Sequence, residues 1–295
     1  MSVFKNPVRF ILNLAGYEVV KKDIIRPLDL RNVCNSPSAV GYYSYIQQAI
    51  IESSPELGRG RPIFTFSREG INPFVVAAKS YLVKGTLESI REVLDNYYNL
   101  VQPKNASEIF SFSLRKDSPL NKLPAWSIVM PWDKRNHKDQ LKHVKKVVNK
   151  ENKQAGGATG IEDGWAWTGP ANPEKIIIES VRLKSILDSI KKRGYQRHNG
   201  MGGDISVYIF MGANDKWCWQ VKTGQHRATA VSVLGYRNVA LRVIKILRRE
   251  DVHCWPNVKN GLFTTQEALS AFDQVLTGEI PGIAAKWVDY ARSKN

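Results

Sequence analysis

The clearest hydrophobic pattern lies between residues 175 and 250. The apolar run 175–179 (KIIIE) predicts a short strand, and apolar positions at helical spacing predict a helix over 180–193, with Ser180 as its N-cap and Gly194 at its end. Alternating positions predict strands over 204–211 and 216–222, joined by the hairpin turn GAND. A helix over 223–235 and a strand over 238–247 follow. The sequence therefore predicts an α+β domain.

The segments on either side carry weaker patterns. Helical spacing predicts helices over 44–51 and 85–100, the second capped by Thr86, and residues 62–70 predict a strand that leads into a turn. A single helix is predicted over 264–278. We therefore divide the chain into a mixed α/β N-terminal region (1–120), a connecting region (121–175), the α+β domain (176–250) and a helical C-terminal extension (251–295).

The composition is typical of a soluble globular protein. The chain has 295 residues, 43% of them hydrophobic, and no apolar run long enough to predict a membrane span. Its three cysteines form no C-x-x-C pair, so neither a disulfide framework nor a thiolate zinc site is indicated. We expect a cytoplasmic protein, and the sequence leaves its oligomeric state open.

Positive charge is concentrated in the connecting region. The chain carries a net charge of +16, and residues 134–153 hold eight Lys or Arg against Asp139 and Glu151. A second basic cluster, Lys191 to Arg193 with Arg197, ends the helix predicted over 180–193. Such runs are typical of a solvated helix face, and equally of a surface that binds an anionic partner such as nucleic acid, a nucleotide or an acidic glycan.

We predict that the basic segment forms a helix, and a Trp-bearing, Gly-rich loop follows it, which we call the Trp loop. Residues 163–170 contain Trp165 and Trp167. Exposed indoles are unfavourable, so we expect both to pack, either at a domain interface or as a platform on which a base, a sugar ring or a cation stacks.

The segment Thr223 to Arg227 combines the residue types of a phosphate site. Gly224 allows a sharp bend, and the next backbone N–H groups open a helix whose dipole attracts anions. Arg227 opposes that dipole unless an anion lies between them, and His226 adds a second donor. A plain glycine turn before a helix is the alternative interpretation.

The surrounding motifs resemble the ParB/sulfiredoxin superfamily. The likeness rests on R-L-x-x-I-L-x-S-I-x-x-x-G (182–194), a hairpin, G-x-H-R-A-x-A (224–230) and Leu234-Gly235, and it covers about 176–250. It implies a nucleotide-binding domain in which the helix opening at Thr223, Gly224, Gln225, His226 and Arg227 contacts the nucleotide. Lys222, next to this opening, could reach a phosphate or equally point to solvent. Members of this superfamily include nucleotide switches of chromosome partition, nucleases, sulfiredoxins and free serine kinases.

Differences between this sequence and the motif of each branch of the superfamily indicate which function is favoured. Gln225 stands where sulfiredoxins have their nucleophilic Cys, which disfavours sulfinic acid repair. A helix-turn-helix module like that of partition proteins is hard to fit after residue 250. The likeness is nearest to the free serine kinases, where Glu179, His226 and Arg227 match the motif, although Thr223 replaces an Asp.

The resulting hypothesis is a kinase that transfers phosphate from ATP or ADP to a hydroxyl group, on a small molecule or a glycan such as a polysaccharide. Glu179 is the expected base, and His226 and Arg227 stabilise the developing charge. Trp165, Trp167 and Arg182 are assigned to the acceptor. No metal site is expected from the protein alone, but Mg²⁺ accompanies nucleotide phosphates and could use Glu179, Asp188 or Asp204.

Other interpretations stay open. Glu179 could simply favour a helix dipole, Asp188 could be a solvated helix residue and Asp204 a turn residue. The competing function is a ParB-like NTPase or nuclease that associates with nucleic acid, favoured by the charge. A nucleotide-binding regulator without turnover is a third alternative, suggested by Thr223. Glu52, Arg59 and Arg61 cannot be placed from the sequence.

Overall fold

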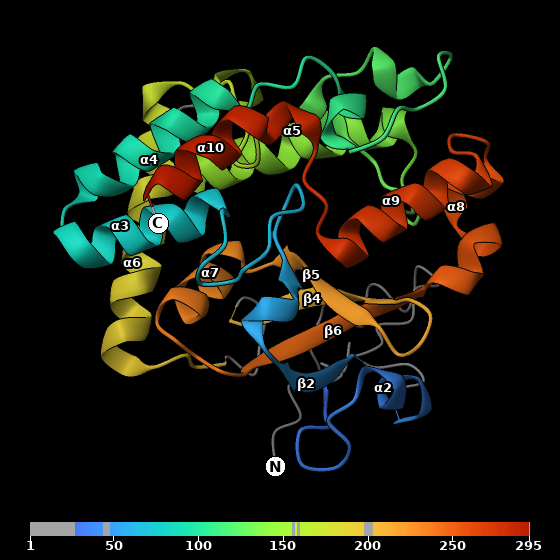
Figure 1. The fold of residues 1–295 in the computed structure, drawn as a ribbon, viewed down its shortest axis with the longest axis horizontal. Coiled ribbons are helices and arrows are strands. Elements are labelled where there is room, and N and C mark those ends of the chain that lie inside the picture. The colour runs from blue at the N-terminus through green and yellow to red at the C-terminus, as the bar shows by residue number, and fades with distance from the viewer. Residues whose placement is uncertain (1–26, 44–47, 155–156, 158–159, 198–202, 295) are drawn as a thin grey trace, which may run out of the picture.

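A six-stranded mixed sheet organises the fold, seen in a computed structural model that describes residues 27–43, 48–154, 157, 160–197 and 203–294 (Figure 1). The strand order is β1-β2-β6-β4-β5-β3. The strands are β1 Leu28–Asp29, β2 Ala49–Ser53, β3 Gly58–Arg59, β4 Ile205–Met211, β5 Trp217–Thr223 and β6 Val239–Arg248.

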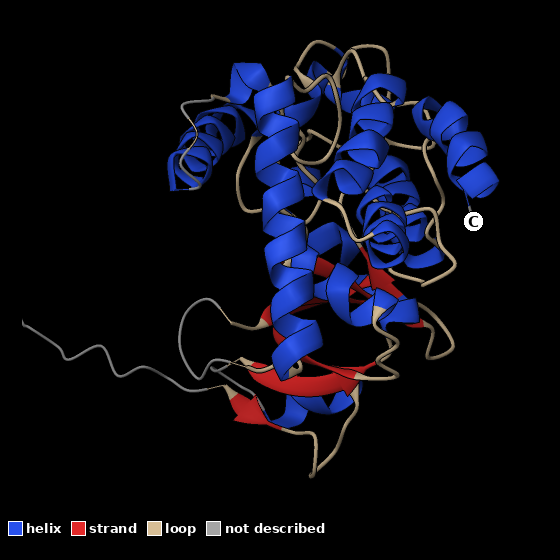
Figure 2. Cartoon of the chain, turned by 90° about the vertical axis from the view of Figure 1, so that its left-hand side faces the viewer, coloured by secondary structure: helices blue, strands red, loops and turns tan. Residues whose placement is uncertain are grey.

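Helices gather mainly on one side of this sheet (Figure 2). They are α2 Pro37–Tyr43, α3 Pro73–Lys84, α4 Leu87–Leu100, α5 His137–Gln154, α6 Pro173–Arg193, α7 Gln225–Val233, α8 Pro256–Lys259, α9 Thr265–Thr277 and α10 Ala285–Lys294. The protein is therefore of the α+β class, as the sequence predicts. The long helix α6 runs from the helical layer down to the sheet (Figure 2), and it packs beside α7.

Strands from the N-terminal region belong to the same sheet as the α+β unit. β2 pairs antiparallel with β6, where Ile51 lies opposite Leu241, and β3 pairs parallel with β5. β4 lies between β5 and β6. The domain boundaries at residues 120, 175 and 250 stay predictions. The sheet, however, combines strands from before residue 120 with strands from after residue 175.

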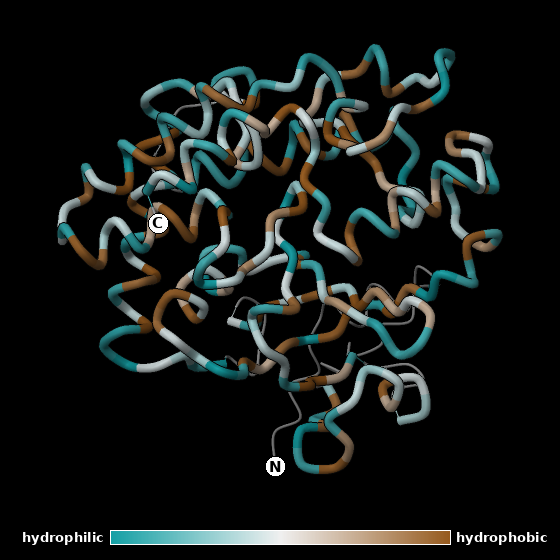
Figure 3. The backbone as a smooth tube through the Cα atoms, viewed as in Figure 1, coloured by the Kyte–Doolittle hydropathy of each residue, from teal (hydrophilic) through white to brown (hydrophobic). Residues whose placement is uncertain are grey.

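The sheet buries a hydrophobic core on each face because its strands alternate. Val207 and Ile209 of β4 join a core with α3, α4, α6, α7 and α10, whereas Phe210 on the opposite face packs in a second core with Phe272 of α9. Hydrophobic residues recur along these strands in Figure 3. Both faces are thus covered, and the site described below lies where the helical layer meets the end of β5.

Several predicted elements are confirmed. α4 begins after Thr86, whose side chain accepts a hydrogen bond from the backbone N–H of Ser89. The basic segment forms α5, the hairpin 204–222 forms β4 and β5, and α7 and β6 follow as predicted. The predicted C-terminal helix is α9, with a capping box between Thr264 and Glu267, although α8 and α10 lie on either side of it.

The predicted strand 175–179 is wrong. These residues belong to α6, which begins at Pro173 after the N-cap Asn172, so Ser180 is not a cap. The run of three isoleucines resembles a strand, but Asn-Pro-Glu is a strong helix start, and Ile177 is exposed while Ile176 and Ile178 are buried. Glu179 therefore lies inside a helix rather than before one.

Two N-terminal predictions also fail. Ala49 to Ile51 form the strand β2 rather than the end of a helix, while residues 44–47 of that predicted helix lie outside the described residues. Residues 62–70 are not a strand, and Thr65 makes only an isolated bridge to Arg59. Phe64 and Phe66 are buried as in a strand, but they fill the main core from a loop.

Candidate functional site

The first turn of α7 opens without a side-chain cap among the described residues. Its N-cap is Gly224, at φ 95° and ψ 26° in the left-handed region, where a Cβ would lie 3.2 Å from Cα of Ile205. Glycine is therefore required here by both conformation and space. The uncapped N–H groups and the helix dipole together provide an anion-binding end.

Gln225 supplies a buried polar side chain at this end of the helix. It is 6% exposed, and neither its amide nitrogen nor its amide oxygen has a hydrogen-bond partner in the part of the chain described. The same is true of Nδ2 of Asn72, and both amides lie close to Gly60. Buried polar groups normally have partners, so the Gln225 amide keeps unused hydrogen-bonding capacity beside Gly60 and Asn72.

Glu179 of α6 binds two cations and faces His226 of α7. Its Oε1 accepts hydrogen bonds from Nζ of Lys175 at 2.7 Å and from Arg182 at 2.9 Å. Nε2 of His226 lies 3.3 Å from Oε2, close enough for ionic attraction but not aligned as a hydrogen bond. Glu179 and Lys175 are almost completely buried and both belong to α6, while His226 is the member of this cluster that α7 contributes.

The positively charged neighbours of Glu179 stabilise its ionised carboxylate. Burial alone would raise the pKa of its carboxyl group, but attraction to His226, Lys175 and Arg182 outweighs burial and holds the pKa well below its ordinary value of 4.5. A carboxylate of lowered pKa is a weak base. The contacts suit Glu179 to hold Arg182 in place and to face His226, and the expectation that it acts as the base stays a prediction.

A recess of about 680 Å³ opens at this end of α7. Helices α5 and α6, the end of β5 and the Trp loop form its wall. The predicted site residues Glu179, Arg182, Trp167 and Lys222 to Arg227 all line it. The structure thus brings together the predicted phosphate site and part of the predicted acceptor site.

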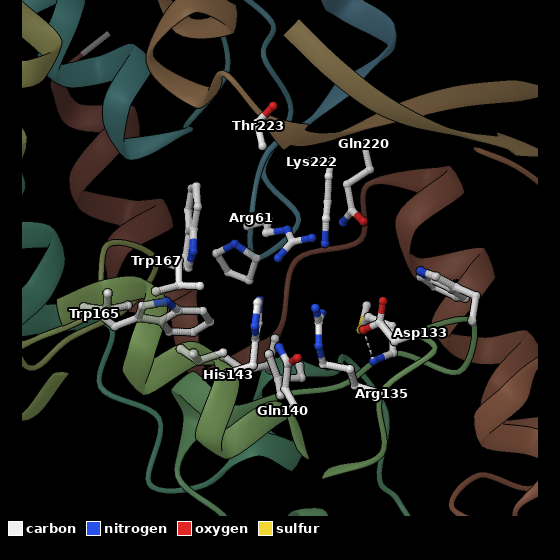
Figure 4. Close-up of a pocket in the computed structure, with 18 of the residues that line it drawn as sticks. Arg61, Asp133, Arg135, Gln140, His143, Trp165, Trp167, Gln220, Lys222 and Thr223 are labelled. Carbon is white, nitrogen blue, oxygen red and sulfur yellow. Dashed lines mark hydrogen bonds between the residues drawn. The ribbon is translucent and has the colours of Figure 1, made fainter. Parts of the chain in front are cut away.

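A second recess, of about 280 Å³, adjoins the first (Figure 4). Arg61 and Lys222 enter it from one side, His143, Gln140 and Arg135 from the other, and Trp165 and Trp167 flank it. Four residues line both recesses: Glu151, Trp167, Lys222 and Thr223. The two recesses therefore form neighbouring halves of one site; we call the first the α7 recess and the second the Trp cavity.

The Trp loop is held firmly by its backbone. Tyr97 donates its hydroxyl hydrogen to the carbonyl of Trp167 at 2.5 Å, and Tyr98 donates to that of Ala166 at 3.1 Å. Gly169 packs so closely that a Cβ would lie 1.8 Å from the carbonyl oxygen of Tyr98. The indole rings of Trp165 and Trp167 meet edge to face with centroids 6.4 Å apart. The backbone of the loop is therefore held in place, and its half-buried indoles line the site, Trp165 in the Trp cavity and Trp167 in both recesses.

The cations of the Trp cavity perturb one another. Burial and then the nearby Arg61 lower the pKa of Lys222 to about 8, with Arg135 adding to the effect and Asp133 opposing it. Burial together with Arg135 and Lys222 also lowers the pKa of His143. Glu151 is exposed as a whole, yet burial around its carboxyl group raises its pKa, with Arg182 opposing and Glu179 reinforcing the shift.

The candidate metal carboxylates do not come together. Glu179 and Asp188 are nine residues apart in α6, which places them about 13 Å apart along the axis and on opposite faces. Asp188 binds Tyr81 and Lys184, and Asp204 binds Arg197. Among the described residues, no three His, Cys, Asp or Glu side chains are placed to hold a metal ion.

The three N-terminal residues that the sequence could not place lie in different parts of the structure. Arg61 lines the Trp cavity. Arg59 is buried, with its guanidinium donating to the backbone carbonyls of Val275 and Leu276, and Glu52 forms an ion pair with Arg31. Of these three residues, only Arg61 lines the candidate site.

Sequence reasoning missed Arg61, Arg135, Gln140, His143 and Gln220 as a group. They come from segments far apart in the chain, and their residue types recur throughout it. The Pro-Trp-Asp-Lys-Arg segment before α5 carried a usable signal, because it combines an aromatic residue with charges just before a basic helix.

The chain matches no protein family, no curated protein and no solved structure. None of the helices in the described segments is both long enough and apolar enough to cross a membrane. The functional argument therefore rests on the residues of the site.

Proposed function

We propose that the protein is a nucleotide-dependent phosphotransferase that acts on a hydroxyl acceptor, with a ParB/sulfiredoxin-like nucleotide-binding unit over about 176–250. One observation carries the proposal: the α7 recess and the Trp cavity meet at Glu151, Trp167, Lys222 and Thr223. A phosphoryl group at the α7 recess would lie next to a hydroxyl group held in the Trp cavity.

The residues of the α7 recess fit nucleotide phosphates. Gly224 leaves the first N–H groups of α7 without a side-chain cap, so these groups can donate to a phosphate oxygen. His226 and Arg227 lie in the same turn and would stabilise charge that develops during transfer. Arg182 reaches the recess from α6, held in place by Glu179.

Transfer would proceed by attack of the acceptor hydroxyl oxygen on the terminal phosphorus of ATP. The new oxygen–phosphorus bond forms, the bond to the bridging oxygen breaks, and ADP leaves with its electron pair; with ADP as donor, AMP leaves. The hydroxyl proton passes to Glu151, a carboxylate of raised pKa that lines both recesses. Mg²⁺ would come with the nucleotide, since the residues present do not form a site of their own, and no step depends on a protein-bound ion.

Phosphorus NMR of the protein with ATP or ADP, Mg²⁺ and a panel of acceptors tests the proposal. A new phosphoester signal should appear with one class of acceptor and disappear in Arg227→Ala. Arg292→Ala, at the exposed end of α10, is the matched control and should keep the signal. Unchanged nucleotide, or phosphate release that ignores every acceptor, contradicts the proposal.

A nucleic-acid function is the second candidate, because all eight cations of residues 134–153 lie exposed on or just before α5. Fluorescence anisotropy with labelled duplex and single-stranded DNA distinguishes the two. Binding at physiological salt that weakens steeply with added salt, and that falls in the triple variant Lys138→Gln, Lys142→Gln, Lys146→Gln, would favour this candidate.

A further inference from the structure

We propose that the Trp cavity binds an acidic monosaccharide unit, with its carboxylate held by Arg61, Arg135 and Lys222 and its ring lying against Trp167. This deepens the proposed function, on which it rests for the statement that the sugar is the phosphate acceptor. The binding itself requires no nucleotide.

The charge of the cavity selects an anion. Arg61, Arg135 and Lys222 come from three separate segments and point into one space (Figure 4). Within the described part of the chain, neither guanidinium forms an ion pair, and the ammonium group of Lys222 lies 5.5 Å from the ring centre of Tyr208. Cations gathered in this way repel one another, so a bound anion would relieve the repulsion.

The number of charges favours one carboxylate. Two carboxylates, Asp133 and Glu151, line the cavity together with the three cations, so the cavity has a net excess of one positive charge. Asp133 also accepts a hydrogen bond from the backbone N–H of Met130 at 2.9 Å, so part of its capacity is used. A singly charged carboxylate balances the cavity, whereas a phosphate dianion would exceed it. Guanidinium groups also match a carboxylate in geometry.

The remaining wall suits a sugar ring. Trp167 lines the cavity, and Tyr97 holds its backbone through a hydrogen bond to the carbonyl group. The flat indole ring of a tryptophan packs well against the C–H face of a sugar. Gln140 and His143 from one side, and Gln220 beside Lys222 from the opposite side, supply donors and acceptors for hydroxyl groups. The volume of about 280 Å³ is at the small end of ligand sites and corresponds to one monosaccharide rather than a nucleotide.

The position of the cavity makes the sugar an acceptor. Lys222 and Thr223 separate it from the first turn of α7, so a hydroxyl group on the bound sugar faces the α7 recess. Glu151 lies at the same boundary, where it could accept the hydroxyl proton. The acceptor class is therefore a hexuronic acid, free or as a unit of an acidic glycan.

Titration calorimetry and Trp fluorescence of the full chain without nucleotide test the proposal, with glucuronate, glucose and glucose 6-phosphate as probes. We expect glucuronate to bind at least tenfold more tightly than glucose, because charge-assisted hydrogen bonds to the carboxylate are lost in glucose. Arg61→Met and Lys222→Met should each weaken glucuronate binding about tenfold or more and leave glucose binding unchanged. Arg292→Met is the matched control and should bind as the wild type does.

Equal binding of glucose and glucuronate, or glucuronate binding that survives both substitutions, overturns the proposal. Tighter binding of glucose 6-phosphate than of glucuronate overturns the carboxylate assignment. Near-UV circular dichroism confirms that each variant is folded, and either variant alone suffices if the other fails to fold. The two proposals fail separately: glucuronate binding without phosphotransfer refutes the proposed function alone, while phosphotransfer to a neutral acceptor without glucuronate binding refutes this inference alone.

Discussion

Glu179 is the central carboxylate of a buried charge cluster on α6 that His226 of α7 faces. Glu179→Gln keeps the shape but leaves the buried ammonium group of Lys175 without a counter-charge. Removing one partner of a buried ion pair typically costs about 3–5 kcal/mol, so we expect the free energy of unfolding to fall by about 3 kcal/mol in urea titrations. Glu162→Gln removes an exposed pair with Lys145 and should leave the urea midpoint unchanged, and an equally small effect in both variants would contradict the assignment.

The same residue predicts how stability depends on pH. The folded-state pKa of Glu179 is lowered, so its contribution is fully present above the ordinary carboxyl value of 4.5 and is lost as the pH falls below that value. Urea midpoints measured between pH 7 and pH 3 should decline below about pH 4.5 in the wild type. In Glu179→Gln the decline should be shallower. Parallel curves for the two proteins would show that Glu179 does not contribute in this way.

Gly169 controls the position of the Trp loop. A Cβ at this residue would overlap the carbonyl oxygen of Tyr98 at 1.8 Å, and a backbone atom can move aside only if α4 or the loop shifts. We expect Gly169→Ala to cost about 2–3 kcal/mol and to change the near-UV circular dichroism of the tryptophans. Gly41→Ala is the control, since nothing lies within 4 Å of its Cβ, and it should be neutral or slightly stabilising. A Gly169→Ala protein with wild-type spectrum and stability would refute the close contact.

At this scale the sequence predicted the residues at the α7 end of the candidate site and the two indoles of the Trp cavity, and it missed the other polar and charged residues of that cavity. Gly224, His226 and Arg227 are neighbours in the chain, so their pattern can be recognised locally. Arg61 and Arg135 contribute only through tertiary contacts with β5, and a lone arginine carries no local signal of that kind.

Among the helices, α6 offers the sharpest test of where an element begins. Asn172 accepts a hydrogen bond from the backbone N–H of Lys175 and donates one to Asp163. Asn172→Ala should therefore cost about 1 kcal/mol or slightly more, as measured by urea unfolding. Ser180→Ala removes a hydrogen bond to the carbonyl of Ile176 inside the helix and should cost less. The reverse order would restore Ser180 as the cap.

The wrong strand prediction for residues 175–179 shows that a local hydrophobic pattern does not distinguish a short strand from part of a helix. Three consecutive isoleucines favour a strand by propensity, but the helix start at Asn172 and Pro173 lies upstream of that window. The hairpin β4–β5 and the helix α7 were predictable because turn residues and periodicity agree there. The short strands β1 and β3 have two residues each and carry no period at all.

For the whole molecule, the shared sheet predicts that the unit 176–250 does not fold alone. Without the N-terminal region, β6 lacks its antiparallel partner β2 and β5 lacks β3, while the main core loses α3 and α4. We expect the isolated fragment to show no cooperative urea transition by circular dichroism, whereas the full chain should show one. A sigmoidal transition for the fragment would instead support an independent domain.

This arrangement also explains why the organisation of the chain was harder to predict than its elements. Strand pairing between residues 49–53 and 239–243 is a contact across most of the chain, and hydrophobic patterning gives a strand without naming its partner. The α+β class follows from the kinds of elements, while the six-strand order follows only from the tertiary structure.

The central place of β6 has a consequence for how the protein is made. β6 lies between β2 and β4, yet it is the last strand to leave the ribosome. Roughly 190 residues separate Ser53 from Val239, so at roughly 5–20 residues per second β2 waits roughly 10–40 s for its partner. During that time Ile50 and Ile51, which become fully buried, stay uncovered on the nascent chain. Translation that slows before codon 239 would prolong this exposure and the opportunity for chaperones to bind.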